Sequence, residues 1–220
     1  ILTSRSTQVT SQVPLSSIVS LTKRKDATIA AGNLALNAAL TAPEIADLER
    51  YLDATKSALL YARKVMLVEG AAEMFLIPAL IEQVKGVKLE RLGISVIAIH
   101  GVHFDVYAKL FRAGSLEKKC AIVADADMKP SDAEDFDQDT DALDLVKLEN
   151  DFVSSFAGAT TFERELVSLG RLPMLIETVR SLNAPQILAQ MEDGLEKLRL
   201  GELNHADETA LRIELGRITL

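Results

Sequence analysis

The chain contains no tryptophan, and aromatic residues make up only 5% of its 220 residues. It has a single cysteine, Cys120, which excludes an internal disulfide framework and a cysteine-based zinc site. No apolar run reaches the roughly 18 residues that a membrane-spanning helix needs, and the first residues lack the pattern of a signal peptide. We therefore expect a cytoplasmic, soluble protein with no membrane partner, in which Cys120 is a buried, inert thiol.

A glycine-rich phosphate-binding loop and a convincing nucleophile–His–Asp arrangement are also missing. The formal net charge of −8 argues against a broad basic surface, although an acidic stretch at 132–144 carries much of that charge. The net charge thus weakens the hypothesis of a nucleic-acid partner but does not exclude it. Part of the acidic stretch has the aspartate spacing of an EF-hand. However, Ala142 and Leu148 stand where glycine and glutamate are required, so we interpret the stretch as a solvated loop.

Short apolar runs alternate with helical segments through the middle of the chain. We predict strands at 65–68, 94–99, 120–124 and 151–156. We predict helices at 72–85 and 104–111, with further helical spacing over 33–63 and 173–220. Strands and helices joined by short connections imply right-handed βαβ units and a parallel sheet. The predicted fold class is therefore α/β, a Rossmann-like and mainly parallel sheet flanked by helices, with an appended helical domain.

The same pattern predicts the domain organisation. Residues 1–25 are interpreted as the tail of a preceding domain with a connector, and 26–60 as a helical segment. The catalytic α/β domain is placed at 61–170 and a helical domain at 171–220. Since the chain does not begin with methionine, we expect it to be part of a longer protein.

Carboxylates follow two of the predicted strands. Glu69 and Glu73 flank Gly70 after the first strand, and Asp125 and Asp127 follow the third. Active sites of open α/β sheets collect at the carboxyl ends of the strands, and residues i and i+2 of an extended segment share one side. Carboxylate oxygens are ligands that Mg²⁺ favours. The pattern therefore predicts a metal-dependent phosphoryl-transfer enzyme.

Glu163, helped by the hydroxyl of Thr161, could complete a second metal position. Two ions can together activate a water and stabilise a leaving oxygen. The alternative is that these acids are solvated. Glu73 would then only stabilise the following helix, through a favourable interaction of its carboxylate with the helix dipole.

Other polar residues carry weaker signals. His100 and His103 follow the second strand and could approach a phosphate or a metal, but loop hydrogen bonding is the simpler interpretation. Lys118 and Lys119 precede the third strand, at the end opposite the carboxylates, and we expect both to be solvated.

At Leu67-Val68-Glu69-Gly70 and at Val123-Ala124-Asp125-Ala126-Asp127 the chain resembles the Toprim fold of topoisomerases, primases and related nucleases. The longer stretches LLYARKVMLVEGAAEMFLIPAL, ISVIAIHGVHFDVYAKLF and TTFERELV resemble the C-terminal nuclease region of the overcoming-lysogenisation-defect (OLD) family. Members of that family join an ABC-type ATPase to a Toprim nuclease. Residues 1–23 are similar to the last ATPase segment, but Arg5 stands where a switch histidine is expected.

The resemblance implies a metal-dependent DNA endonuclease that hydrolyses phosphodiesters with two Mg²⁺ ions, or with Mn²⁺ or Ca²⁺. It implies DNA and a covalently linked ATPase domain as partners, with ATP bound only by that domain, and it leaves a homodimer open. The family also uses a lysine in a Lys-Gly-x-Phe-Ala-like context, which this chain lacks. The implied catalytic acids are Glu69, Asp125 and Asp127. The implied metal ligands are Glu69, Glu73, Asp125, Asp127, Thr161 and Glu163.

Two other functions remain open. One is a topoisomerase- or primase-like Toprim module. A topoisomerase needs a nucleophilic tyrosine, usually supplied by a separate domain, and Tyr51, Tyr61 and Tyr107 stand in helical contexts with no sign of that role. A degenerate Toprim domain used for binding or dimerisation would not need an intact set of acids.

Overall fold

The computed structural model describes most of the chain. The described residues are 1–24, 26, 28–52, 56–100, 104–125, 145–158, 162, 172–201, 208, 210, 211 and 215. The chain divides into two compact units. The first consists of residues 1–124 and 142–157, and the second of 125–141 and 158–220.

A four-stranded parallel sheet forms the centre of the first unit. Its strand order is β4-β3-β5-β6, and every neighbouring pair is parallel. The bounds of the strands are Lys64–Val68 for β3, Ile94–Ala98 for β4, Cys120–Ala124 for β5 and Val153–Ala157 for β6. The predicted α/β class, parallel sheet and strand positions are therefore confirmed.

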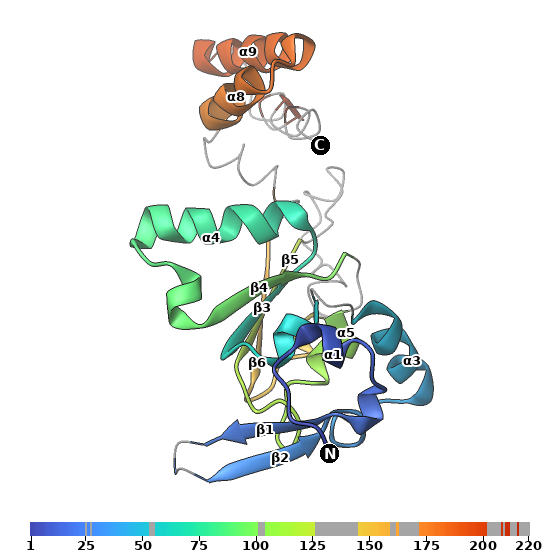
Figure 1. Ribbon diagram of the computed structural model, residues 1–220. Coiled ribbons are helices and arrows are strands. Elements are labelled where there is room, and N and C mark those ends of the chain that lie inside the picture. The colour runs from blue at the N-terminus through green and yellow to red at the C-terminus, as the bar shows by residue number, and fades with distance from the viewer. Residues whose placement is uncertain are drawn as a thin grey trace. The chain divides into compact units, whose positions relative to one another are not determined.

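Helices flank this sheet on both sides, as the strand order requires. From β3 the chain passes through α4 (Ala71–Lys85) to β4, on one side of β3. From β4 it passes through α5 (Phe104–Ala108) to β5, on the other side of β3. Right-handed crossovers in opposite directions place their helices on opposite faces, and Figure 1 shows α4 and α5 on the two sides of the sheet.

Buried aliphatic side chains hold the sheet in place. Leu67 of β3 and Ile122 of β5 are fully buried, and Val65 is nearly so. Full burial of such a side chain contributes about 1.5–3 kcal/mol. The thiol of Cys120 lies in the same core, and burial raises its pKa to about 12. An inert, buried cysteine was predicted and is confirmed.

The N-terminal part of the first unit differs from the prediction. The segment 26–60 is not helical throughout, because Ile29–Asn33 forms the strand β2. It pairs with β1 (Val19–Lys23) in an antiparallel hairpin. Strand β1 lies within residues 1–25, for which the sequence predicts a domain tail and a connector. The helices of this region are short: α1 (Thr7–Thr10), η1 (Leu15–Ser17), α2 (Leu34–Asn37), α3 (Ala42–Tyr51) and η2 (Lys56–Leu60).

An ion pair fastens this hairpin to the segment before β5. Arg24 donates to both carboxylate oxygens of Glu117, at 2.7 and 2.5 Å, and the amide of Gly114 donates to the same carboxylate at 2.9 Å. These donors lower the pKa of Glu117 to about 2.

Replacing Glu117 with glutamine should lower the free energy of unfolding at neutral pH by about 1 kcal/mol, a modest figure because Arg24 is half exposed. A carboxyl whose pKa is lowered on folding stabilises the fold above its unfolded pKa of about 4.5, and that contribution is lost as the pH falls toward 2. Urea unfolding of the wild type and of Glu117→Gln across the acid range is the measurement. A difference that stayed constant down to the lowest pH would contradict this explanation.

In the second unit, α8 (Leu172–Ser181) and α9 (Pro185–Leu200) pack together. Met191 and Leu215 are fully buried between apolar neighbours of these helices. The predicted helical character of this part of the chain is confirmed for the residues that the structure describes. No helix among them is long and apolar enough to cross a membrane.

Candidate metal site at the sheet edge

Strands β3 and β5 are neighbours, and their carboxyl ends lie side by side. Val68 pairs with Val123 near the end of the ladder. Glu69 is the residue that follows β3, and Asp125 is the residue that follows β5. Connections leave these strands in opposite directions, which makes their boundary the switch point where open α/β sheets bind ligands. Two of the predicted acids, Glu69 and Asp125, therefore directly follow the two strands that flank this point.

Hydrogen bonds to the next strand fix the backbone at Glu69. The amide of Ile99 donates to the carbonyl of Val68 at 2.9 Å, and the amide of His100 donates to the carbonyl of Glu69 at 2.8 Å. The pairing of β3 with β4 thus continues to Glu69 itself. The position of this acid is set by the sheet rather than by a free loop.

Glu73 lies in the first turn of α4 and is 8% exposed. Its Oε2 accepts a hydrogen bond from the amide of Gly70 at 2.9 Å. This bond satisfies one of the amides that a helix N-terminus leaves without a partner, and the positive end of the helix favours the carboxylate. Within the described residues Oε1 accepts no hydrogen bond. One oxygen of a largely buried carboxylate is therefore left for another ligand.

The backbone of Gly70 lies close to the Glu73 carboxylate. A Cβ at position 70 would lie 3.2 Å from Oε2 of Glu73, closer than most real Cβ contacts. The backbone of Gly70 is extended, so its dihedral angles do not require glycine; a Cβ there would only make the Glu73 carboxylate shift by a few tenths of an ångström. The spacing Glu69-Gly70-x-x-Glu73 has a local structural reason, the hydrogen bond from the amide of Gly70 to Glu73, as well as a chemical one.

The structure covers part of the predicted ligand set. Glu69, Glu73 and Asp125 are described, whereas Asp127, Thr161 and Glu163 lie outside the described residues, as do His103 and the acidic stretch. Among the residues that are described, no three His, Cys, Asp or Glu side chains are grouped as metal ligands would be. The prediction for the complete set therefore stays a prediction.

Lys118 is not solvated, and the sequence-based expectation was wrong for this residue. Its ammonium group donates to the carbonyls of Leu59, Leu60 and Ala62, at 3.3, 2.8 and 2.9 Å. These carbonyls end η2 and begin the approach to β3, 56–59 residues away in the sequence. Nothing in the local sequence signals the contact. Lys118 ties the start of β5 to the start of β3, while Lys119 is exposed, as expected.

Replacing Lys118 with methionine should lower the free energy of unfolding by about 1–3 kcal/mol, because three partly buried carbonyls lose their donor. Burial lowers the pKa of Lys118 from 10.5 to about 8. Between these pH values the unfolded chain binds more protons than the folded one, so the wild type should gain stability relative to Lys118→Met as the pH rises. Urea unfolding from neutral to alkaline pH measures the difference, and a gap that shrank with rising pH would contradict the assignment.

Comparisons with known proteins agree with the fold. Residues 60–127 match the family model described as "Overcoming lysogenization defect protein-like, TOPRIM domain". The C-terminal region of the Burkholderia pseudomallei OLD protein is 24% identical, with a TM-score of 0.51, over 72% of this chain and 86% of that one. The C-terminal region of the Xanthomonas campestris pv. campestris OLD protein, phased with platinum, is 25% identical, with a TM-score of 0.50, over 73% and 82%. No curated protein sequence matches the chain.

The matched segment runs from the end of η2 to just past β5, so it contains the sheet edge described above. The predicted resemblance to the OLD family and the predicted Toprim fold are both confirmed.

Proposed function

We propose that residues 60–127, an OLD-like Toprim domain, form the catalytic core of a metal-dependent DNA endonuclease. The observation that carries the proposal is the placement of Glu69 and Asp125 directly after the two strands that flank the switch point of the sheet. The reaction is hydrolysis of a phosphodiester, which nicks or cuts the DNA strand. Water is the nucleophile, and no covalent intermediate with the protein forms.

The donor chemistry fits a hard divalent ion. The described candidates are all carboxylates, and oxygen ligands suit Mg²⁺, Mn²⁺ and Ca²⁺. The buried Glu73 supports this fit, since its Oε1 has no hydrogen bond from a described residue. The proposed ligands of the ions are Glu69, Glu73, Asp125, Asp127, Thr161 and Glu163. When bound, two such ions activate a water and offset the charge of the phosphodiester.

The residues of this chain contribute position and charge. The β3–β4 ladder holds Glu69, the N-terminus of α4 holds Glu73, and β5 leads directly into Asp125. Asp127 follows Asp125 by two residues in the sequence. Carboxylates placed by rigid elements can hold ions without rearranging during the reaction.

A linked ATPase domain is part of the proposal. Residues 1–23 resemble the final segment of the family's ABC-type ATPase, and ATP would be bound by that domain. The partner is DNA, the location is the cytoplasm, and a homodimer is one arrangement that such a protein could adopt.

The test is incubation of supercoiled plasmid with the purified chain in Mg²⁺, in Mn²⁺ and in EDTA. The proposal predicts metal-dependent conversion to open circles or linear DNA. Relaxed closed circles would instead indicate a topoisomerase. A folded protein that binds plasmid but leaves it supercoiled would indicate a Toprim domain kept for binding.

A further inference from the structure

His100 has an unusual backbone conformation at the proposed active edge. Its φ angle is +57°, in the left-handed region that non-glycine residues seldom adopt. Among the described residues, Ala39 and Asn183 are the other non-glycine cases. Both follow the ends of helices, α2 and α8, where a left-handed residue is an ordinary way to finish a helix. His100 follows a strand, so that explanation does not apply to it.

The sheet holds His100 beside the first acid. Its amide donates to the carbonyl of Glu69 at 2.8 Å, the last bond of the β3–β4 ladder. The left-handed conformation comes at that same residue, directly after the paired segment. Strained backbone persists where the surroundings impose it, and such positions cluster at functional sites.

The imidazole of His100 is available to a ligand. The side chain is exposed, and the imidazole makes no hydrogen bond or ion pair with any described residue. The candidate residues that follow β3 on the same unit, Glu69 and Glu73, are carboxylates and only accept hydrogen bonds when ionised. A phosphodiester also presents only acceptors on its non-bridging oxygens. A substrate at this edge therefore needs a donor, and an imidazole carries an N–H in both its neutral and its charged form.

We propose that His100 is a substrate-contacting residue whose imidazole donates a hydrogen bond to a phosphate oxygen of the DNA strand. The proposal rests on the proposed function of the same edge. It assigns His100 no proton transfer and no metal. Its contribution is to binding and placement of the phosphate next to the carboxylates.

Two substitutions of similar shape distinguish hydrogen-bond donation by the side chain from a purely structural role of the left-handed backbone at position 100. Asparagine and aspartate both tolerate the left-handed conformation, but only asparagine keeps an N–H donor. In His100→Asp the dissociation constant for a fluorescent DNA duplex, measured by anisotropy with Ca²⁺, should rise more than about tenfold. In His100→Asn it should stay within about threefold of the wild type. Ala39→Gly, which changes a left-handed residue away from this edge, is the matched control and should bind as the wild type does.

Nicking kinetics give a second readout. If the plasmid is nicked, His100→Asp should raise KM in parallel with the dissociation constant and change kcat less. Melting temperatures of all variants show whether each is folded. His100→Gly fits the backbone without strain and removes the donor without adding a charge, so it should weaken DNA binding as His100→Asp does. Binding of His100→Gly as tight as that of the wild type would assign the loss in His100→Asp to its negative charge and overturn the proposal.

The outcomes separate the two proposals. A wild type that binds DNA without nicking it overturns the nuclease, while the comparison of His100→Asp with His100→Asn still decides the role of His100. Equal affinity of the folded variants and the wild type overturns the proposal for His100. A wild type with no affinity for DNA overturns both.

Discussion

Replacing Glu69 with glutamine, or Asp125 with asparagine, is expected to lower the rate of plasmid nicking by about a thousandfold or more. Each substitution keeps the size and shape of the side chain and removes one negative charge from the proposed ion site. Glu69 and Asp125 follow strands whose positions are fixed by the ladders of the sheet. The melting temperature should therefore change little while activity is lost.

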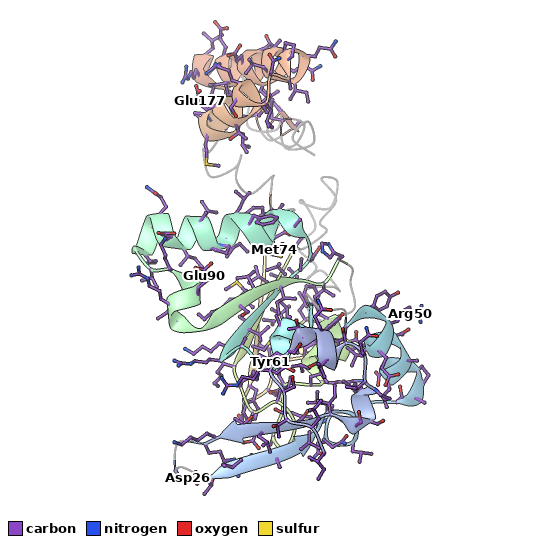
Figure 2. The ribbon with its side chains drawn as sticks, viewed as in Figure 1. Asp26, Arg50, Tyr61, Met74, Glu90 and Glu177 are labelled. Atoms are coloured by element: carbon purple, nitrogen blue, oxygen red, sulfur yellow. The ribbon has the colours of Figure 1, made fainter. Side chains whose placement is uncertain are left out.

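Two acids at the opposite ends of the strands are suitable controls. Glu90, labelled in Figure 2, lies in the short helix before β4, and Asp151 lies just before β6. Both are exposed, and Glu90→Gln and Asp151→Asn should nick plasmid at close to the wild-type rate. If these controls lost as much activity as Glu69→Gln, a general effect of charge on DNA handling would replace the ion site as the explanation. Full activity in Glu69→Gln would contradict the site outright.

Replacing Gly32 with alanine is expected to destabilise the first unit by about 3 kcal/mol or more. A Cβ on Gly32, in β2, would lie 2.0 Å from the carbonyl oxygen of Gly114 and 2.7 Å from its carbonyl carbon. The obstacle is backbone, which cannot rotate away as a side chain can. The hairpin would have to separate from the segment before β5, weakening the Arg24–Glu117 pair as well.

Thermal or urea unfolding measures this loss, with Gly86→Ala as the control. Gly86 ends α4 in the left-handed conformation, and a Cβ there would meet no atom within 4 Å. That substitution should cost only about 1 kcal/mol, from the strain of a left-handed alanine. If Gly32→Ala were as mild as Gly86→Ala, the close approach of the hairpin to Gly114 would not exist in solution.

The central sheet could be predicted because its strands are short, apolar and separated by helical segments. Residues 65–68 and 120–124 are short apolar runs bounded by polar residues, and a run of that length is typical of a strand in the core. The hairpin was missed for the opposite reason. Its second strand, Ile-Ala-Ala-Gly-Asn, contains one β-branched residue, and the apolar residues after it fit a helical period. Its pairing with β1 and its contact with Gly114 are tertiary effects that no local pattern reports.

The site was predictable to the extent that it follows from the sheet. The sequence predicts that Glu69 and Asp125 directly follow two strands of one parallel sheet, and the structure shows that these strands, β3 and β5, are neighbours. Their joint role in an ion site stays a prediction. The backbone conformation of His100 could not be predicted, because it depends on how the ladder ends. Lys118 was misjudged since the carbonyls that it binds are distant in sequence.

Binding of Mn²⁺ to the purified chain, followed by electron paramagnetic resonance or calorimetry without DNA, tests the central claim most directly. The wild type should bind Mn²⁺ with a dissociation constant of roughly millimolar or tighter, since the proposed site offers the ion several carboxylates. Asp125→Asn should weaken that binding at least about tenfold, and Asp151→Asn should leave it unchanged. A wild type without specific binding, or an Asp125→Asn variant that binds as tightly as the wild type, would contradict a metal site at the carboxyl ends of β3 and β5.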